Sequence, residues 1–517
     1  MANEQVYFSK GLESQLPTTN IKVGGLYHCT DTKNTYIGTS LTTMELWSSG
    51  ATKKQLNGGV VEGSGTDASG EYSHAEGEGS IASGKRSHAE GYRTEASGNS
   101  SHAEGYLTIA SYPYSHAEGY NALATAIASH AEGYKTEASS DNTHAEGKYT
   151  VASSIQAHAE GYRTVASGSN SHAEGENTVA SKAGSHAEGH YTNANGNSSH
   201  AEGLYTIAAN SGSHSEGYLT GAFGENAHSE GQITFAAGSN SHAEGGHSNT
   251  GEFTTAILTS VSDINYIIKN VSEEKVSEGK LVSLRTDLNE AIKNCAYIKK
   301  ILSYKHPIEI QLDHTLGELN ETPVAIFEGV VAGGISSHAE GRFTYASGDT
   351  AHAEGQQTIA TGNYSHAEGI STVASDYASH AEGKNTIATS HAAHAEGQRT
   401  TASGIASHAE GKYTEALSEA SHAEGKYSIA SAKTAHAEGH QTIASGVAAH
   451  AEGKETQASG TAAHAEGSRT VASGSTAHAE GKGTVASGTA AHAEGNTTKT
   501  AQRLHVQLTG MANSSSY

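Results

Sequence analysis

The 517-residue chain has little of what usually fills a protein core. Aromatic residues make up 6% of it, with 6 Phe and 1 Trp beside 24 Tyr, and there are only 4 Pro. So few large apolar side chains cannot fill a conventional core over this length. Disorder is not indicated either, because charged residues are only 17% of the chain and its 61 Gly recur at regular intervals.

Other absences narrow the classes of function. No apolar run is long enough for a membrane-spanning helix, and the N-terminus lacks the basic-then-apolar pattern of a secretory signal. The formal net charge of −24 disfavours a nucleic-acid partner, because binding phosphate requires a basic face. The two cysteines, Cys29 and Cys295, lie far apart and predict no disulfide framework, which is typical of a protein made in a reducing compartment.

A 14-residue repeat, S-H-A-E-G-x-x-T-x-A-S-G-x-x, dominates the chain. Its His occurs 13 times from His74 to His242 and 12 times from His338 to His492, always in steps of 14 residues. The gap of 96 residues between His242 and His338 is not a multiple of 14 and indicates an insertion. Small and polar residues alternate twice per unit, which predicts two short strands and two turns. Stacked units then form a parallel β-solenoid that rises about 4.8 Å per coil.

The alternation assigns residues to faces, because successive side chains of a strand point to opposite sides. A coil this narrow holds only small side chains, so His88 and Glu90 must point outward. The residue between Thr and Ala also points outward and varies, as on a solvent-exposed face. The interior set of this coil comprises Ser87, Ala89, Gly91, Thr94, Ala96 and Gly98.

His and Glu recur in all 25 copies, which solvent exposure alone does not require. A coil filled with Ser, Ala, Thr and Gly also buries too little apolar area to be stable alone. We therefore interpret the His/Glu face as a contact between identical chains packed around a symmetry axis.

The repeat units resemble the β-roll of YadA-type trimeric adhesin heads, whose coils carry S-x-A-x-G twice per 14 residues. They resemble more closely the S-H-A-E-G-x-x-T-x-A-S-G arrays of bacteriophage fibre and spike proteins. The resemblance covers roughly residues 60–247 and 335–500, and it implies a left-handed parallel β-roll that assembles as a parallel homotrimer. One difference is that adhesin heads commonly place aliphatic residues where this chain has His and Glu.

A threefold contact would bring carboxylates together, and neighbouring imidazoles could relieve their repulsion by hydrogen bonding or by taking up protons. We therefore predict a polar trimer-interface ladder in which the carboxylates raise the pKa of each His. Metal binding by stacked His and Glu rings, and simple exposure of this face, are the alternatives; we predict no catalytic residues, no metal and no cofactor. The ladder residues are His74, Glu76, His88, Glu90, His102, Glu104, His172, Glu174, His242, Glu244, His338, Glu340, His408, Glu410, His492 and Glu494.

Five segments are predicted: an N-terminal attachment module (1–58), a first β-roll shaft (59–247), a small inserted α+β domain (248–334), a second shaft (335–500) and a C-terminal tail (501–517). Residues 24–40 are typical of a β-hairpin with its turn at 31–34, and this region resembles the short modules that anchor phage head and tail fibres. In the insert, stretches rich in β-branched residues predict strands at 252–260, 264–269, 280–285, 308–312 and 324–331. Residues 286–302 have apolar side chains at helical spacing, which predicts one amphipathic helix.

These features predict a mainly β, homotrimeric structural fibre of a bacteriophage, placed in the virion after assembly in the host cytoplasm. Its expected partners are capsid or tail proteins at the N-terminal module and a host-surface glycan or protein, without nucleic-acid binding or membrane insertion. A bacterial trimeric surface adhesin is the alternative, and a glycan-degrading spike the second. We expect no enzyme, because the acidic residues of the insert form no recognisable motif: Glu273, Glu274, Glu278, Asp287, Asp313, Glu318 and Glu321.

Overall fold

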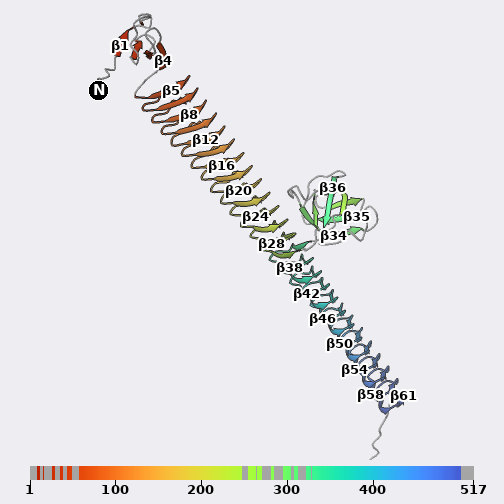
Figure 1. Cartoon of the computed structure of the whole chain (residues 1–517). Coiled ribbons are helices and arrows are strands. Elements are labelled where there is room, and N and C mark those ends of the chain that lie inside the picture. The colour runs from red at the N-terminus through yellow and green to blue at the C-terminus, as the bar shows by residue number, and fades with distance from the viewer. Residues whose placement is uncertain are drawn as a thin grey trace, which may run out of the picture. The chain divides into compact units, whose positions relative to one another are not determined.

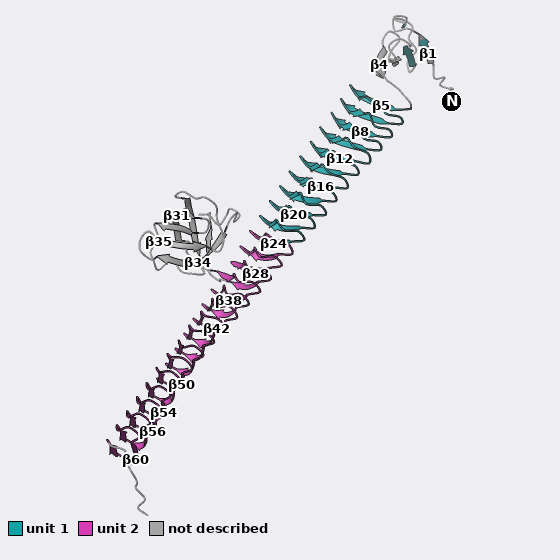
Figure 2. Cartoon of the chain, turned by 180° about the vertical axis from the view of Figure 1, so that it is seen from behind, with its two compact units in different colours: residues 1–199 teal, residues 200–517 magenta. Residues whose placement is uncertain are grey.

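The computed structural model describes residues 58–246 and 329–501, together with Leu16 and the strands β1–β4 and β31–β36 (Figure 1). The chain divides into two compact units, Met1–Ser199 and His200–Tyr517 (Figure 2). All the regular elements in the described parts are strands, so no helix there could cross a membrane.

Each repeat forms one coil with a long and a short strand, as the sequence predicts. The long strand begins at the motif His and ends four residues later, as in β8 (His88–Tyr92). The short strand begins seven residues after the His and has two residues, as in β9 (Glu95–Ala96). This pattern runs from β6 (His74–Glu78) to β61 (Lys499–Thr500), apart from the coils at the insertion.

Consecutive coils pair in parallel and in register. The long strand β8 pairs with β10 (His102–Tyr106), so that identical motif residues lie side by side. One further coil precedes the first motif His, because β5 (Val60–Ser64) pairs with β6 and places Glu62 beside Glu76. The repeat therefore begins one coil before the first His.

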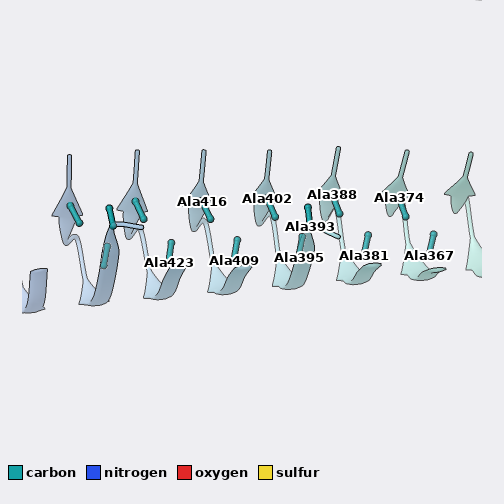
Figure 3. Close-up of a cluster of buried hydrophobic side chains, with 14 of the residues drawn as sticks. Ala367, Ala374, Ala381, Ala388, Ala393, Ala395, Ala402, Ala409, Ala416 and Ala423 are labelled. Carbon is teal, nitrogen blue, oxygen red and sulfur yellow. The ribbon is translucent and has the colours of Figure 1, made fainter. Parts of the chain in front are cut away.

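The interior of the coils consists of small side chains. Ala89 and Ala96 are fully buried, and Ser87 and Thr94 nearly so, which confirms the predicted inward set for these residues. Two equivalent columns of buried Ala lie in unit 2, as from Ala367 to Ala423 (Figure 3). Many motif Ser hydroxyls also donate a hydrogen bond within the turn that precedes their strand. For example, Ser87 Oγ donates to the carbonyl of Gly84 at 2.7 Å.

The Gly of the S-H-A-E-G motif has a different role from the one predicted. Gly98 is buried, but Gly91 is only half-buried and does not fill the interior. Gly91 has φ +119°, and a Cβ on it would lie closer than 3.0 Å to the carbonyl oxygen of Gly105 in the next coil. This position requires Gly because the backbones of successive coils approach closely at a left-handed corner.

Within unit 2, the solenoid continues across the insertion. Strand β30 (His242–Gly246) pairs with β38 (His338–Arg342), and β29 (Thr234–Ala236) pairs with β37 (Val330–Ala332). The arrays expected as two shafts thus stack on each other, and the gap of 96 residues holds one 14-residue coil plus 82 further residues. Strand β37, which the sequence boundary placed inside the insert, belongs to the solenoid.

The inserted segment contains six strands that pair antiparallel and close into a barrel in the order β31-β32-β35-β34-β33-β36. They correspond to the five predicted stretches and one more: β31 (Thr254–Ser262), β32 (Asn265–Lys269), β33 (Leu281–Ser283), β34 (Cys295–Ser303), β35 (Ile308–Leu312) and β36 (Thr322–Phe327).

The predicted helix over 286–302 is wrong where the structure describes it. Residues 295–303 form β34, which pairs with both β33 and β35, while residues 286–294 lie outside the described residues. Pairing on two sides satisfies the backbone hydrogen bonds of this stretch, and it overrides a helical spacing that is only a weak preference.

The N-terminal strands form a small sheet. β1 (Phe8–Gly11) pairs in parallel with β2 (Leu26–Cys29), β2 pairs antiparallel with β3 (Thr35–Gly38), and β3 pairs antiparallel with β4 (Met44–Ser48). The β2–β3 pair confirms the predicted hairpin, whose turn at 31–34 lies outside the described residues. Tyr27 and Cys29 are buried, so this Cys packs into the module.

Candidate functional site: the His/Glu face

The long strands present His and Glu on their outer face, as predicted. Ala89 lies between His88 and Glu90 and points into the coil, so the two polar side chains point away from it. The side chain of His88 is 36% exposed and that of Glu90 is 44% exposed. All eight predicted pairs occupy the first and third positions of a long strand, in β6, β8, β10, β20 (His172–Glu176), β30, β38, β48 (His408–Lys412) and β60 (His492–Asn496).

The imidazoles form a stacked column along each unit. The rings of His74 and His88 are 4.8 Å apart and 2° from parallel, and those of His88 and His102 are 4.8 Å apart and 9° from parallel. In unit 2 the rings of His408 and His422 are 4.8 Å apart and 4° from parallel, whereas successive rings from His242 to His366, and those of His478 and His492, are tilted by 42° to 50°. This spacing is the rise from one coil to the next, so the backbone register itself imposes the contact between rings.

Each imidazole lies near the carboxylate of its own strand without a hydrogen bond to it. In seven of the eight predicted pairs His Nε2 is 3.5 to 3.9 Å from Glu Oε2, and His408 and Glu410 are farther apart than 4.0 Å. These distances exceed those of a hydrogen bond. In seven predicted His, Nε2 is shielded from solvent and has no hydrogen-bond partner among the described residues: His74, His88, His102, His172, His242, His338 and His408.

Within the single chain the pKa of His88 and His102 is lowered, opposite to the rise predicted for His in the threefold contact. Partial burial lowers the pKa of His88 most, and the imidazoles of His102 and His74 lower it further, against a smaller raising effect of Glu90. The pKa of His102 is lowered by burial and by His116, and nine further motif His behave alike. Burial, followed by the imidazoles of His116 and His144, lowers the pKa of His130 to about 4. Stacking shields each ring from water and adds like charges above and below, and this outweighs one half-exposed carboxylate.

The same residues offer groups of possible metal ligands. His74, Glu76 and His88 each place one ligand atom within 4.8 Å of the others, and equivalent groups recur along the column. A transition metal needs ligand atoms about 2.0–2.2 Å away whose lone pairs converge on it. The planes of His74 and His88 differ by only 2°, so their in-plane lone pairs run parallel. The stacked geometry therefore disfavours two imidazoles on one ion and favours a hydrogen-bonding face.

The sequence interpretation missed a third outward column, formed by the last residue of each long strand. It follows the motif Glu by two residues, on the far side of the corner at the motif Gly. In unit 1, Tyr92, Tyr106, Tyr120 and Tyr134 occupy it, and their rings stack 4.8 to 4.9 Å apart. Recurrent Tyr and Lys directly after the motif Gly are the sequence signal that identifies this column.

The outward residue of the short strand is also less variable than expected. Of the 25 residues at this position, 15 are Ile, Leu or Val, as at Val151, Val165 and Val179, each half-buried. The two sheets of a coil therefore present different faces, one of His and Glu and one largely aliphatic.

The geometry of these coils can now be compared with known repeats. Four stretches of the chain match the YadA head domain repeat. They are residues 63–87, 75–101, 159–181 and 339–365. Each lies in the solenoid, and the last begins in β38, directly after the insertion. The YadA-head-like coils thus occur in both arrays. No curated protein matches this chain.

Proposed function

We propose that this chain is the shaft of a fibrous, adhesin-type surface protein, and that three copies associate through the His/Glu face. One observation carries the proposal: His and Glu of successive coils stand in register, and seven of the predicted His have an Nε2 atom that is shielded from solvent and lacks a hydrogen-bond partner among the described residues, namely His74, His88, His102, His172, His242, His338 and His408. A shielded nitrogen without a partner is costly, and a second copy of the same face offers carboxylates and imidazoles that could pair with it.

The interior supports the same conclusion. Its buried columns consist mainly of Ala, Ser and Thr, and burying a methyl group contributes far less than burying a Leu or Phe side chain. Association along the His/Glu face would remove further surface from water over many coils at once. A parallel arrangement keeps equivalent coils at the same height, so each pair of chains repeats the same contact.

We further propose that the fibre belongs to a bacteriophage particle and reaches the host surface. The S-H-A-E-G pattern and the N-terminal β2–β3 hairpin support this assignment through their resemblance to phage fibres. The match to the YadA head domain repeat supports the alternative, a bacterial surface adhesin. Both assignments share the same assembly and the same adhesive role.

Light scattering tests the association directly. At neutral pH we expect a mass near 159 kDa, three times the 53.1 kDa of the chain. A variant with His102→Glu, His116→Glu and His130→Glu adds carboxylates to the His/Glu face and should lower the mass to that of one chain.

The matched control places three Glu on the other face, in Ile109→Glu, Leu123→Glu and Val151→Glu. Glu95 and Glu137 already occupy this position in neighbouring coils, so the control should keep the threefold mass. A monomeric wild-type chain would contradict the proposal. The proposal would also be contradicted if the control variant dissociated while the variant with His102→Glu, His116→Glu and His130→Glu kept the threefold mass, because the contact would then lie on the aliphatic face.

A further inference from the structure

Basic residues are concentrated at one corner of the solenoid. Residues 58–246 and 329–501 contain 17 Lys and Arg, and 12 of them stand at the last position of a long strand or at the residue after it. Only three acidic residues share this corner: Glu78, Glu176 and Glu455. A chain with a net charge of −24 thus carries a predominantly basic corner.

The longest basic run lies in unit 2. Between Lys384 and Lys482, seven of eight consecutive coils carry a cation at this corner, and His440 stands in the eighth. The strand register places Lys412 beside Lys426, and the other Lys at the same position of their own strands. All seven are exposed, and we call them the basic edge: Lys384, Arg399, Lys412, Lys426, Lys454, Arg469 and Lys482.

Most charges of the basic edge have no counter-ion in the part of the chain that the structure describes. Glu455 pairs with Arg469 at 2.8 Å and with Lys454 at 3.7 Å. The other five cations form no ion pair within 4.0 Å among the described residues. Away from this corner, by contrast, Lys85 pairs with Glu71 and Lys433 with Glu419, each at 2.7 Å. The positive charge of the basic edge is therefore available to an external anion.

Two Tyr add polar and aromatic surface at the centre of the basic edge. The Arg399 guanidinium donates to the Tyr413 hydroxyl at 3.1 Å and lies 5.3 Å from the centre of its ring. The rings of Tyr413 and Tyr427 stack 4.9 Å apart, and Lys426 lies 5.2 Å from the Tyr427 ring. These cation–π contacts hold the cations in line along the corner and leave the hydroxyl groups at the surface.

We propose that the basic edge binds a linear acidic polysaccharide running along the solenoid axis. The cations recur from coil to coil with about 4.8 Å between coils, so they face a polymer whose carboxylate or sulfate groups recur along its length. Tyr hydroxyls and Arg N–H groups can also bind sugar hydroxyls. This proposal rests on the proposed role as an adhesin-type surface protein and names the class of ligand for it.

The same geometry disfavours nucleic acid as the occupant. The Tyr ring faces, which bases would need for stacking, are turned toward each other and toward cations. An acidic polysaccharide needs no stacking partner, since its carboxylate or sulfate groups can pair with the cations and its hydroxyl groups with Tyr and Arg.

Binding of the full chain to heparin, polygalacturonate and neutral dextran tests the proposal, with a thymidine oligonucleotide for comparison. We expect both acidic polysaccharides to bind and dextran not to bind. The affinity should fall at least about tenfold between roughly 50 and 500 mM salt, because the contact is ionic. Light scattering on the same samples records the mass independently.

A pair of matched variants locates the site. Lys412→Gln, Lys426→Gln, Lys454→Gln and Lys482→Gln remove four charges from the basic edge, and should weaken binding at least about tenfold. Lys85→Gln, Lys182→Gln, Lys433→Gln and Lys499→Gln remove four charges elsewhere on the solenoid and should change it less than about twofold.

Three outcomes would each overturn the proposal. The two variants could lose equal affinity for the acidic polysaccharides, dextran could bind as tightly as they do, or the oligonucleotide could bind more tightly. Absence of polysaccharide binding by a chain of threefold mass would overturn it while leaving the proposed assembly intact. A monomer that binds through the basic edge would support the binding site and contradict the assembly.

Discussion

Removing the neighbours of one imidazole in the stacked column should raise its pKa. His130 lies 4.6 Å from both His116 and His144 in ring-centre distance, and its pKa is lowered to about 4, first by burial and then by these two neighbours. In the double variant His116→Asn and His144→Asn we expect the pKa of His130 to rise but to stay below 6.5, because partial burial remains.

The separation of the rings sets the size of this effect. Two imidazolium charges 4.6 Å apart repel each other by about 0.9 kcal/mol in water and by about 3.6 kcal/mol at an effective dielectric constant near 20. Either value makes it unfavourable to protonate adjacent rings. Protons should therefore enter alternate imidazoles first, and the column should titrate over a range of pH wider than that of an isolated His.

The same shift links stability to pH. The folded-state pKa of His130 lies below the unfolded value of 6.5, so the unfolded chain binds more protons between these values. Stability is therefore complete above about pH 6.5 and falls as the pH drops toward 4. The full shift would correspond to about 3 kcal/mol, but the side chain is 35% exposed, and we expect solvent to reduce the loss to about 1–2 kcal/mol.

NMR of chains with ¹³C-labelled His rings measures these titrations, and a His130→Asn spectrum assigns the resonance. The control variant His422→Asn with His450→Asn removes two imidazoles far along the chain and should leave the pKa of His130 unchanged. A single step at pH 6.5 with unit slope for the whole column would refute the reasoning. An unchanged His130 in the neighbour variant would refute the contribution of stacking.

Two further predictions concern the coil itself. Gly77→Ala should destabilise the chain by at least about 3 kcal/mol in thermal unfolding, because φ of Gly77 is +99° and the new Cβ would overlap the Gly91 carbonyl. In the control Gly79→Ala the new Cβ meets only the Arg93 side chain, so this variant should cost about 1 kcal/mol. Equal losses of stability in the two variants would contradict this explanation. Ala409→Leu should lower the stability by about 1–3 kcal/mol in the same assay, because Ala409 is fully buried. The control Val447→Leu at an exposed position should change the stability by less than about 0.5 kcal/mol. If Ala409→Leu left the stability unchanged, the interior would have room for larger side chains.

The solenoid was predictable because every coil repeats the same local constraints. Alternation alone places Ala89 inside and His88 outside, and the narrow coil excludes larger inward side chains. The coil at β5 lies within the shaft predicted from residue 59; Val60 replaces the motif His there, and Glu62 and Gly63 keep the spacing. The residue type at the position of the motif His can therefore change while the backbone spacing of the coil is kept.

The strand β34 shows where local pattern fails. Leu288, Ile292 and Cys295 have helical spacing, yet the described residues 295–303 are a strand held between β33 and β35. The strands that pair with this segment decide its secondary structure. They lie outside the segment, so a pattern within its own residues does not predict the strand. Likewise, no local signal shows that His242 pairs with His338, since 82 extra residues separate the two coils.

The sequence by itself determined the coil, its rise and the two side chains that it turns outward, because a 14-residue repeat of period-2 strands allows little else. Only the tertiary structure decided how those side chains behave. Stacking in register shields the imidazoles of His88 and His130 and surrounds them with like groups, so their pKa falls although a carboxylate stands beside each. The same register brings Lys from separate coils into one basic edge, which is scattered in the sequence and continuous only in space.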